Sequence, residues 1–474
     1  MGQMNKSQTV PRTRFAPSPT GYLHVGGIRT ALFAWLLARQ GGGQFILRLE
    51  DTDKAREVQG AAEHIVDSLQ ALGLDFDEGP IRQSADLEIY KQYAQKLIDK
   101  GLAYADPYTP AEVQAFRESA QKDKKPFLYR NHRPESPPAW DGTTPLRFKT
   151  NPQKWEWHDA VMGDLHSGPE SQDDFILMKS DGYPTYNFAH IVDDAEMRIT
   201  HVIRGQEFLA STPNYLNLYD ALSLERPILA TMPHILGPDG NKKLSKRDGA
   251  KDVLDYIRDG YLPDALISFI ATLGWNDGTE QETFSKEELI EKFSLDRVGK
   301  SGARFDERRL LWVNGAFIRE LSLDDLYDKV GDFWPAEAAG YNDDYKKSVL
   351  GLTQERLKYF AELPEVTNFF FTDLPVNLDL INGNKQLKKL DHTELKNLLE
   401  QAQASLEQSD FSVDDLQERL NKLLEITGQK PGILFSLVRI ATTWAAASPG
   451  LAETLNVLGK ERSLTRLQNT IQNL

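Results

Sequence analysis

The feature that most constrains this chain is a glycine-rich turn near its N-terminus, set between a strand pattern and a helix pattern. In residues 14–30 (RFAPSPTGYLHVGGIRT), two prolines stiffen the start of the turn, and Gly26 and Gly27 leave the backbone bare just before a helix. A helix N-terminus carries partial positive charge, so this turn suits a nucleotide phosphate, to which His24 can donate. The alternative is an ordinary strand-to-helix turn with a surface histidine.

The residues around this turn alternate between strand and helix patterns. Residues 10–15 and 44–49 (QFILRL) are strand-like, and the apolar spacing in residues 28–39 and 61–72 predicts amphipathic helices. A helix that crosses between two strands implies a parallel sheet. Residues 197–204 (MRITHVIR) read as a further strand of that sheet. We therefore predict an α/β fold with a Rossmann-like parallel sheet.

The rest of the chain changes character twice. Residues 89–185 are rich in proline and contain short strand-like pieces, which favours an α+β insertion into the sheet domain. After about residue 320 there is little strand signal, so the C-terminal third is expected to be mostly helical. Ser285 with Glu288, and Ser412 with Asp415, have the spacing of helix N-terminal caps.

Composition limits the class of protein. The 474 residues include 55 basic and 70 acidic side chains, a net charge of -15, which argues against a nonspecific electrostatic grip on nucleic acid. There is no cysteine, hence no disulfide and no thiolate zinc site. No apolar run approaches the roughly 20 residues of a membrane span, and the N-terminus has no apolar signal region. We expect an intracellular protein without membrane attachment.

Two segments are basic against this acidic background. Residues 121–133 (QKDKKPFLYRNHR) are interpreted as a solvated face. Residues 237–251 (GPDGNKKLSKRDGAK) place the lysines of KKLSKR in a glycine-rich loop, which suits a step in which charge builds on departing pyrophosphate. A plain basic loop is the alternative for this motif taken alone. Its position about 220 residues after the His24 turn, in an α/β context, favours the chemical interpretation.

Together the two motifs resemble the HIGH and KMSKS signatures of class I aminoacyl-tRNA synthetases. The stretches PSPTGYLHVGG, FILRLEDTD, SDGYPTYNFAHIVDD, THVIRGQEF and FDERRLLWVNGAFIRE are similar to the glutamyl-tRNA synthetase family. The resemblance is strong from about Arg12 to Arg319 and weaker to the end of the chain. It implies a catalytic domain in two parts (9–88 and 186–240), an acceptor-end-binding insertion (89–185), a stem-contact domain carrying the KLSKR loop (241–320) and a helical anticodon-binding region (321–474).

Three charged residues lie where predicted strands of one sheet end. Arg14, Glu50 and Arg204 are at the carboxyl ends, where open α/β sheets bind ligands. Two guanidinium groups and one carboxylate match a ligand with two carboxylates and one ammonium, which is glutamate. The alternative for each arginine is a surface salt bridge.

The resemblance implies a role for further residues. Arg14 and Tyr186 would hold the side-chain carboxylate of glutamate, Arg204 its α-carboxylate, and Ser18 and Glu50 its amino group. Two other residues, Ala16 and His190, belong to the same expected glutamate site. ATP would lie against a second set: Thr20, Gly21, His24, Gly26, Gly27, Leu244, Ser245, Lys246 and Arg247. His24, Lys243 and Lys246 are the expected catalytic residues, and Arg356 is the expected anticodon contact.

The same resemblance implies ATP with Mg²⁺ as a substrate, L-glutamate and tRNA(Glu) as partners, a monomer and a cytoplasmic location. Glu50, Asp51 and Asp53 could instead form a metal site, but neighbouring residues on a strand point to opposite faces. We expect no dedicated metal site, and no zinc because the cysteines of some relatives are absent.

Four positions depart from the family pattern. Gly27 replaces the second imidazole of the HIGH-like motif, and KLSKR differs from KMSKS at Leu244 and Arg247. His190 stands where relatives often carry an amide. Competing interpretations are a glutaminyl-tRNA synthetase, a truncated paralogue that modifies a tRNA base, a metabolic nucleotidylyltransferase and an inactive RNA-binding protein. The helical tail, the length and the KLSKR loop argue against the first three, and the intact charged residues against the last.

Overall fold

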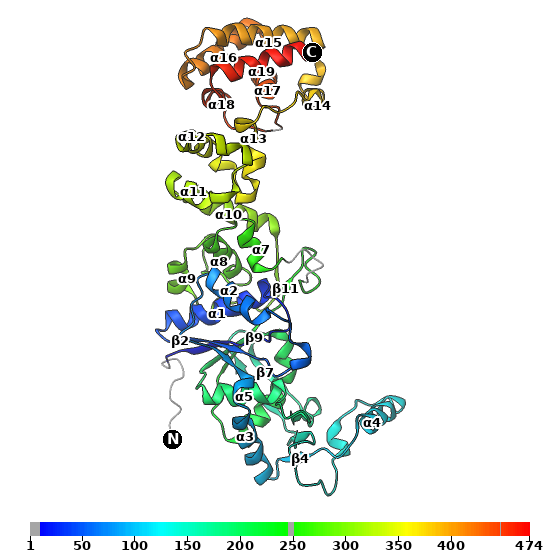
Figure 1. The fold of residues 1–474 in the computed structure, drawn as a ribbon. Helices are drawn as coiled ribbons and strands as arrows, with labels where there is room; N and C mark the ends of the chain where they lie inside the picture. Colours follow the sequence, from blue (N-terminus) through cyan, green and yellow to red (C-terminus); the bar gives the residue numbers. More distant parts are fainter. Residues whose placement is uncertain (1–9, 245–250, 446) are drawn as a thin grey trace. The chain divides into compact units, whose positions relative to one another are not determined.

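A computed structural model describes residues 10–244, 251–445 and 447–474 of the chain (Figure 1). The chain divides into two compact units. The first contains the described residues up to Arg258 together with Pro263–Leu310, and the second contains Asp259–Leu262 and Leu311–Leu474. Among the described residues, no helix has the length and apolarity that crossing a membrane requires.

A seven-stranded sheet forms the centre of the first unit. Its order is β3-β2-β1-β9-β10-β6-β7, and every neighbouring pair is parallel except β6 and β7. Because β1 lies between β2 and β9, the carboxyl ends of these three strands are adjacent. The strands are β1 (Arg12–Phe15), β2 (Gln44–Leu49), β3 (Glu78–Arg82), β6 (Trp155–Asp159), β7 (Gly163–Ser167), β9 (His201–Gly205) and β10 (Ile228–Met232).

Helices cover both faces of this sheet. In Figure 1, α1 and α2 lie on one side and α3 and α5 on the other. Helix α1 packs so closely on β1 that the buried hydroxyl of Thr13 donates to the backbone oxygen of Ala34 at 2.8 Å. The helices of this unit are α1 (Val25–Gln40), α2 (Ala61–Ala71), α3 (Leu87–Asp99), α4 (Pro110–Lys122), α5 (Tyr186–Glu196), α6 (Thr212–Leu222), α7 (Val253–Arg258), α8 (Pro263–Ala271) and α9 (Lys286–Lys292).

The predicted insertion, residues 89–185, contributes strands to two sheets. Strands β4 (Ala103–Ala105), β5 (Leu146–Phe148) and β8 (Ile176–Met178) form an antiparallel sheet of their own. The β6–β7 hairpin instead joins the large sheet, where Asp159 is in register with Leu229 of β10. Helix α4 buries none of its residues and begins with a capping box at Thr109 and Glu112. A short two-stranded sheet pairs β11 (Ile235–Leu236) with β12 (Ala303–Arg304).

The second unit is helical, and none of its described residues forms a strand. Leucines of α15, α16 and α17 form its largest apolar cluster, in which Leu416, Leu420 and Leu423 share one face as their spacing predicts. The helices are α10 (Glu307–Glu320, at the boundary), α11 (Leu323–Val330), α12 (Asp343–Thr353), α13 (Leu363–Phe371), α14 (Leu378–Asn382), α15 (His392–Glu407), α16 (Val413–Thr427), α17 (Pro431–Thr443), α18 (Leu451–Leu458) and α19 (Lys460–Asn473).

Local signals are mostly confirmed, with corrections. Ser285 and Glu288 form the predicted capping box, whereas Ser412 caps α16 without the reciprocal bond. The strand predicted from residue 197 begins only at His201, because the preceding residues end α5 and Arg198 turns the chain with φ 54°. In the C-terminal region, the helix that ends at Thr353 continues as a single 3₁₀ turn, Gln354–Arg356.

Candidate active site

A cavity of about 410 Å³ opens where β1, β2 and β9 end. This central pocket brings together residues from the turn after β1, from β2, α5 and β9, and from the start of the lysine-rich loop. The predicted site residues that line it are Arg14, Ala16, Ser18, Thr20, His24, Gly26, Gly27, Glu50, Tyr186, Arg204 and Lys243. The three charged residues predicted to converge at one edge of the sheet therefore do so.

Arg204 is a buried cation in the wall of this pocket. Its side chain comes from β9, is 6% exposed, and donates from Nη2 to the hydroxyl of Thr212 at 3.1 Å. The guanidinium carbon lies 4.9 Å from the ring centre of Tyr215. Within the part of the chain that the structure describes, no carboxylate forms an ion pair with it. A buried guanidinium without a carboxylate favours an anionic ligand.

Arg14 differs from Arg204 because an acid already occupies one edge of its guanidinium. Its Nε and Nη2 donate to the carboxylate of Asp194 at 3.0 and 3.2 Å, and its Nη1 donates to the backbone oxygen of Ile203 at 3.3 Å. Burial opposes ionisation of Asp194, but the charges of Arg14 and Arg48 outweigh it and hold the pKa of that carboxyl well below its ordinary value. The outer edge of Arg14 is what remains for a ligand.

Glu50 supplies the negative charge of the pocket. It follows β2 directly and is 4% exposed, and its Oε1 accepts from Nη2 of Arg48 at 3.1 Å. Burial raises the pKa of Glu50 to about 7, although the positive charges of Arg48 and Arg14 oppose that rise. Tyr186 also lines the pocket, and burial together with the charge of Glu50 raises the pKa of its hydroxyl. An ammonium group is the ligand that such a carboxylate would favour.

His24 caps the helix that follows the glycine turn. Its Nδ1 accepts from the backbone amide of Gly26 at 3.1 Å, so the proton of the neutral ring lies on Nε2, which can donate to a phosphate oxygen. A Cβ at Gly26 would lie 3.0 Å from the His24 ring, and one at Gly27 2.6 Å from the Leu23 side chain. A side chain at Gly26 would therefore crowd the His24 cap, and one at Gly27 would collide with Leu23.

The lysine-rich loop begins at the rim of the pocket. Nζ of Lys243 lies 3.2 Å from Oε1 of Glu207, which also lines the cavity. Leu244 donates its backbone amide to Ile235 at 2.8 Å and does not line the cavity. Ser245, Lys246 and Arg247, which were predicted to bind ATP, lie outside the described residues.

Two other predicted site residues do not line the pocket. Gly21 lies in the turn but away from the cavity. His190 is 2% exposed, and its ring packs against Tyr186 at 4.9 Å and Tyr215 at 4.6 Å between centres. Burial lowers the pKa of His190 to about 4, so the ring is neutral. The ring of His190 therefore lies behind the pocket wall formed by Tyr186, and its predicted contact with glutamate stays a prediction.

The acidic run after β2 does not converge on a metal. Glu50 contacts Arg48, Asp51 accepts from the amide and hydroxyl of Ser84, and Asp53 pairs with Arg56. In the described ranges no group of three or more histidine, aspartate or glutamate side chains could hold a metal ion. Asp51 and Asp53 instead stabilise the local structure, whereas Glu50 lines the pocket.

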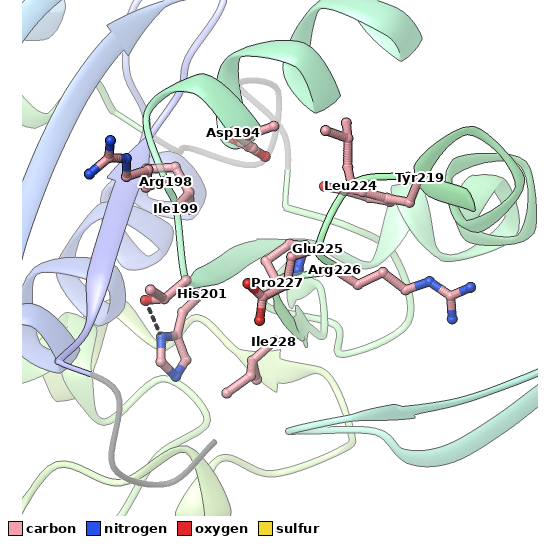
Figure 2. A pocket seen from close by; sticks show the side chains of 12 residues that line it. Asp194, Arg198, Ile199, His201, Tyr219, Leu224, Glu225, Arg226, Pro227 and Ile228 are labelled. Carbon is pink, nitrogen blue, oxygen red and sulfur yellow. Dashed lines mark hydrogen bonds between the residues drawn. The ribbon is translucent and has the colours of Figure 1, made fainter. Parts of the chain in front are cut away.

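Several residues of the site were not singled out from the sequence. Arg48 and Asp194 hold Glu50 and Arg14, and Arg29, Glu207 and His234 complete the wall. Figure 2 shows a second cavity, of about 340 Å³, which Asp194 also lines and which lies at the amino ends of β9 and β10. In that view the guanidinium groups of Arg198 and Arg226 point away from each other, so this cavity does not converge on one ligand charge.

The second unit contains the predicted anticodon contact. Arg356 is exposed on the 3₁₀ turn after α12. Burial lowers the pKa of Arg439 on α17, and the charge of Arg356 lowers it further, so the two cations lie near one another. Nε of Arg439 is buried without a hydrogen-bond partner among the described atoms.

Comparison with known proteins agrees with this geometry. Residues 10–312 match the catalytic domain of class I tRNA synthetases (E and Q), and residues 325–471 match an anticodon-binding domain. The glutamate–tRNA ligase of Dehalococcoides mccartyi is 40% identical over 479 residues, covering 98% of both chains. The chain belongs to the glutamate–tRNA ligase family. The ligase of Legionella pneumophila is 39% identical over 98% of both chains.

A solved structure of a glutamate–tRNA ligase also superposes on the whole chain. The Elizabethkingia meningosepticum protein, crystallised in complex with its amino acid, matches with a TM-score of 0.85 at 30% identity, over 98% of this chain and 100% of the other. The ligase fold, an α/β catalytic region followed by a helical region, is therefore that predicted from the sequence.

Proposed function

We propose that this chain activates L-glutamate with ATP and transfers the glutamyl group to the 3′ end of tRNA(Glu). The observation that carries the proposal is the charge pattern of the central pocket: Arg204, which has no carboxylate partner among the described residues, the outer edge of Arg14, and the Glu50 carboxylate. Two cations and one anion complement an α-amino diacid. A neutral amide could not reproduce the paired hydrogen bonds between a carboxylate and a guanidinium, which favours glutamate over glutamine.

In the proposed first step, an oxygen of the glutamate α-carboxylate attacks the α-phosphorus of ATP, and the bond from that phosphorus to the bridging oxygen breaks. Glutamyl-adenylate forms and pyrophosphate leaves with the electron pair of the broken bond. No protein nucleophile takes part, so the chain contributes position and charge. His24 would donate from Nε2 to a phosphate oxygen. Lys243 and Lys246 would stabilise the charge on pyrophosphate.

In the proposed second step, a hydroxyl of the terminal ribose of tRNA attacks the acyl carbon of the adenylate. AMP leaves, and the glutamyl ester of tRNA remains. Mg²⁺ would accompany ATP, held mainly by the phosphates, because the described residues form no metal site of their own. Arg356 would contact the anticodon. We further propose that the chain acts in the cytoplasm, as a monomer.

Pyrophosphate exchange tests the proposal. Purified chain with ATP, labelled pyrophosphate and tRNA(Glu) is expected to exchange label in the presence of glutamate and not of glutamine, and to charge tRNA(Glu). Arg204→Ala is expected to raise the glutamate KM by about 100-fold, because a charge-assisted pair is lost, and to leave the ATP KM unchanged. Arg226→Ala, at an arginine paired with Asp220 away from the central pocket, is the matched control. Exchange with neither amino acid would refute the proposed reaction.

A further inference from the structure

One arginine that does not line the central pocket contacts Glu50, one of the charges proposed to bind glutamate. Arg48 of β2 is 0% exposed, although its side chain carries a full charge. Its Nη2 donates to Oε1 of Glu50 at 3.1 Å, and its Nη1 donates to Oδ1 of Asp194 at 2.8 Å. A third carboxylate, that of Asp193, lies 3.6 Å from Nε. The guanidinium group of Arg48 therefore binds Glu50, which directly follows β2, together with Asp193 and Asp194 of α5.

Asp194 continues this contact to the other side of the pocket. The same Oδ1 that accepts from Arg48 also accepts from Nε of Arg14 at 3.0 Å, and Oδ2 accepts from Nη2 of Arg14 at 3.2 Å. Glu50, Arg48, Asp194 and Arg14 are thus joined in one buried chain of alternating charge. We call these four residues the charge relay.

The charge relay decides which atoms remain for a ligand. Asp194 accepts from Nε and Nη2 of Arg14, and Ile203 accepts from Nη1, so an incoming carboxylate can reach only the remaining N–H groups of Nη1 and Nη2. Arg48 takes Oε1 of Glu50, and Oε2 has no hydrogen-bond partner among the described residues. The groups that remain for a ligand are the outer N–H groups of Arg14 and Oε2 of Glu50. Their separation is set by the shared contacts with Arg48 and Asp194 rather than by the flexible side chains alone.

We propose that Arg48 and Asp194 are positioning residues that fix the spacing and the charge of Glu50 and Arg14 and thereby set the affinity for the amino acid. This inference rests on the proposed function. A solely stabilising role explains the relay less well, because a buried ion network is weak evidence for stability, and apolar residues of similar volume often stabilise a fold as much. The two ends of the relay, Glu50 and Arg14, both line the central pocket, which favours a role in ligand binding.

The inference predicts changes of opposite sign in the pH dependence of glutamate use. Removing the positive charge of Arg48 raises the pKa of Glu50, whereas removing the like charge of Asp194 lowers it. The charged and titratable groups that act on Glu50, or on which Glu50 acts, come from five elements: Arg14, Arg48, Tyr90, Tyr186, Asp194 and Tyr215. A variant that keeps the charge of Arg48 should leave the pH profile in place.

The experiment measures tRNA-dependent pyrophosphate exchange between about pH 5.5 and 8.5, roughly 1.5 units on either side of neutrality, in the wild-type chain, Arg48→Lys, Arg48→Gln and Asp194→Asn. Arg48→Lys keeps one charge but cannot reach both carboxylates with one ammonium. It is expected to raise the glutamate KM by about tenfold with the ATP KM unchanged. Arg48→Gln is expected to move the acid limb of glutamate kcat/KM upward by about one pH unit, and Asp194→Asn to move it downward.

The matched control is Arg12→Lys, at a second arginine of the same sheet that forms a two-pronged pair with Glu78 at 2.8 Å but lies at the amino end of β1. Equal changes in the glutamate and ATP KM, or acid limbs that move in the same direction, overturn the inference. Failure of all three relay variants to fold while Arg12→Lys folds also overturns it, in favour of a structural role. Absence of glutamate-dependent exchange in the wild-type chain refutes the proposed function itself and removes the basis of this inference.

Discussion

Nε2 of His64 lies 2.6 Å from Oδ2 of Asp252, the second described residue after the lysine-rich loop. The other ring nitrogen of His64 accepts from the backbone amide of Leu23 at 3.4 Å, and the ring of Tyr22 stacks on the imidazole with centres 4.5 Å apart. The side chain of His64 therefore links Leu23, the residue before His24, to Asp252, which follows the lysine-rich loop.

Replacing His64 should disturb activation without disturbing glutamate binding. We expect His64→Ala to lower pyrophosphate exchange about tenfold, because small displacements of phosphate-binding groups are costly, and to lower the free energy of unfolding by about 1 kcal/mol. The glutamate KM should not change. His158→Ala, at a surface histidine 2.7 Å from Asp164, is the matched control. Equal exchange rates in both variants would contradict this role.

Glu50 should make glutamate use depend on pH. Because burial raises its pKa to about 7, the carboxyl is increasingly protonated, and unable to attract an ammonium group, as the pH falls below that value. We expect glutamate kcat/KM to fall about tenfold for each pH unit below the pKa and to level off above it. Measuring glutamate kcat/KM at saturating ATP as a function of pH, from about one unit below to one unit above that pKa, gives the profile. The same acid limb in Glu50→Gln would exclude this assignment.

Lys246 should carry much of the charge stabilisation in adenylate formation. We expect Lys246→Ala to lower the rate of pyrophosphate exchange by roughly 10²-fold or more, the size of effect seen when one preorganised donor is removed. Lys251→Ala, just beyond the KLSKR motif, serves as the control because Lys251 lies near the ring of Tyr256. An unaffected exchange rate in Lys246→Ala would count against the assignment.

The insertion should depend on a buried carboxylate. Asp174, whose side chain is 0% exposed, accepts from the hydroxyl of Tyr104 at 2.7 Å, from the Arg133 guanidinium at 2.6 and 2.7 Å, and from the amide of Thr150 at 2.9 Å. We expect Asp174→Asn to lower the free energy of unfolding by about 3 kcal/mol, measured by urea denaturation. Asp123→Asn, at an exposed pair, should change stability little. Equal stabilities would show that hydrogen bonding suffices without charge.

Arg356 should affect the choice of tRNA and not the chemistry. We expect Arg356→Ala to lose about tenfold of the discrimination between tRNA(Glu) and anticodon-substituted tRNA, the size of one base contact. Arg439→Ala should act in the same direction if both cations face the same ligand. Charging rates with the two tRNAs measure the ratio. If the variant and the parent discriminate equally, Arg356 reads no base.

The parts of the fold and site that the sequence predicts correctly depend on local patterns. The strands that carry Arg14 and Arg204, and the strand before Glu50, are short apolar runs, and strand ends of a parallel sheet share one edge. Asp194 was not singled out because its partners, Arg14 and Arg48, lie about 180 and 146 residues away. No periodicity encodes such a contact.

Other differences between the predicted and the observed structure also depend on packing between residues that are far apart in the sequence. The histidine at position 190 stands in a motif that implies a ligand contact, yet its place on the helix turns it behind Tyr186. The 3₁₀ turn at Arg356 interrupts a run that has helical composition. The outer neighbour of β10 is strand β6, which the insertion supplies. Tertiary packing decides this pairing, because the carboxylate of Asp159 in β6 accepts from the amide and hydroxyl of Thr231 in β10.

That pairing limits how far the chain could be shortened. Residues 89–185 include both outer strands beyond β10, so a truncated form that lacks them would present a bare row of amide and carbonyl groups along β10. Exposed strand edges recruit other chains. A minimal glutamate-activating fragment would therefore need a replacement for the β6–β7 hairpin, and without one it should self-associate.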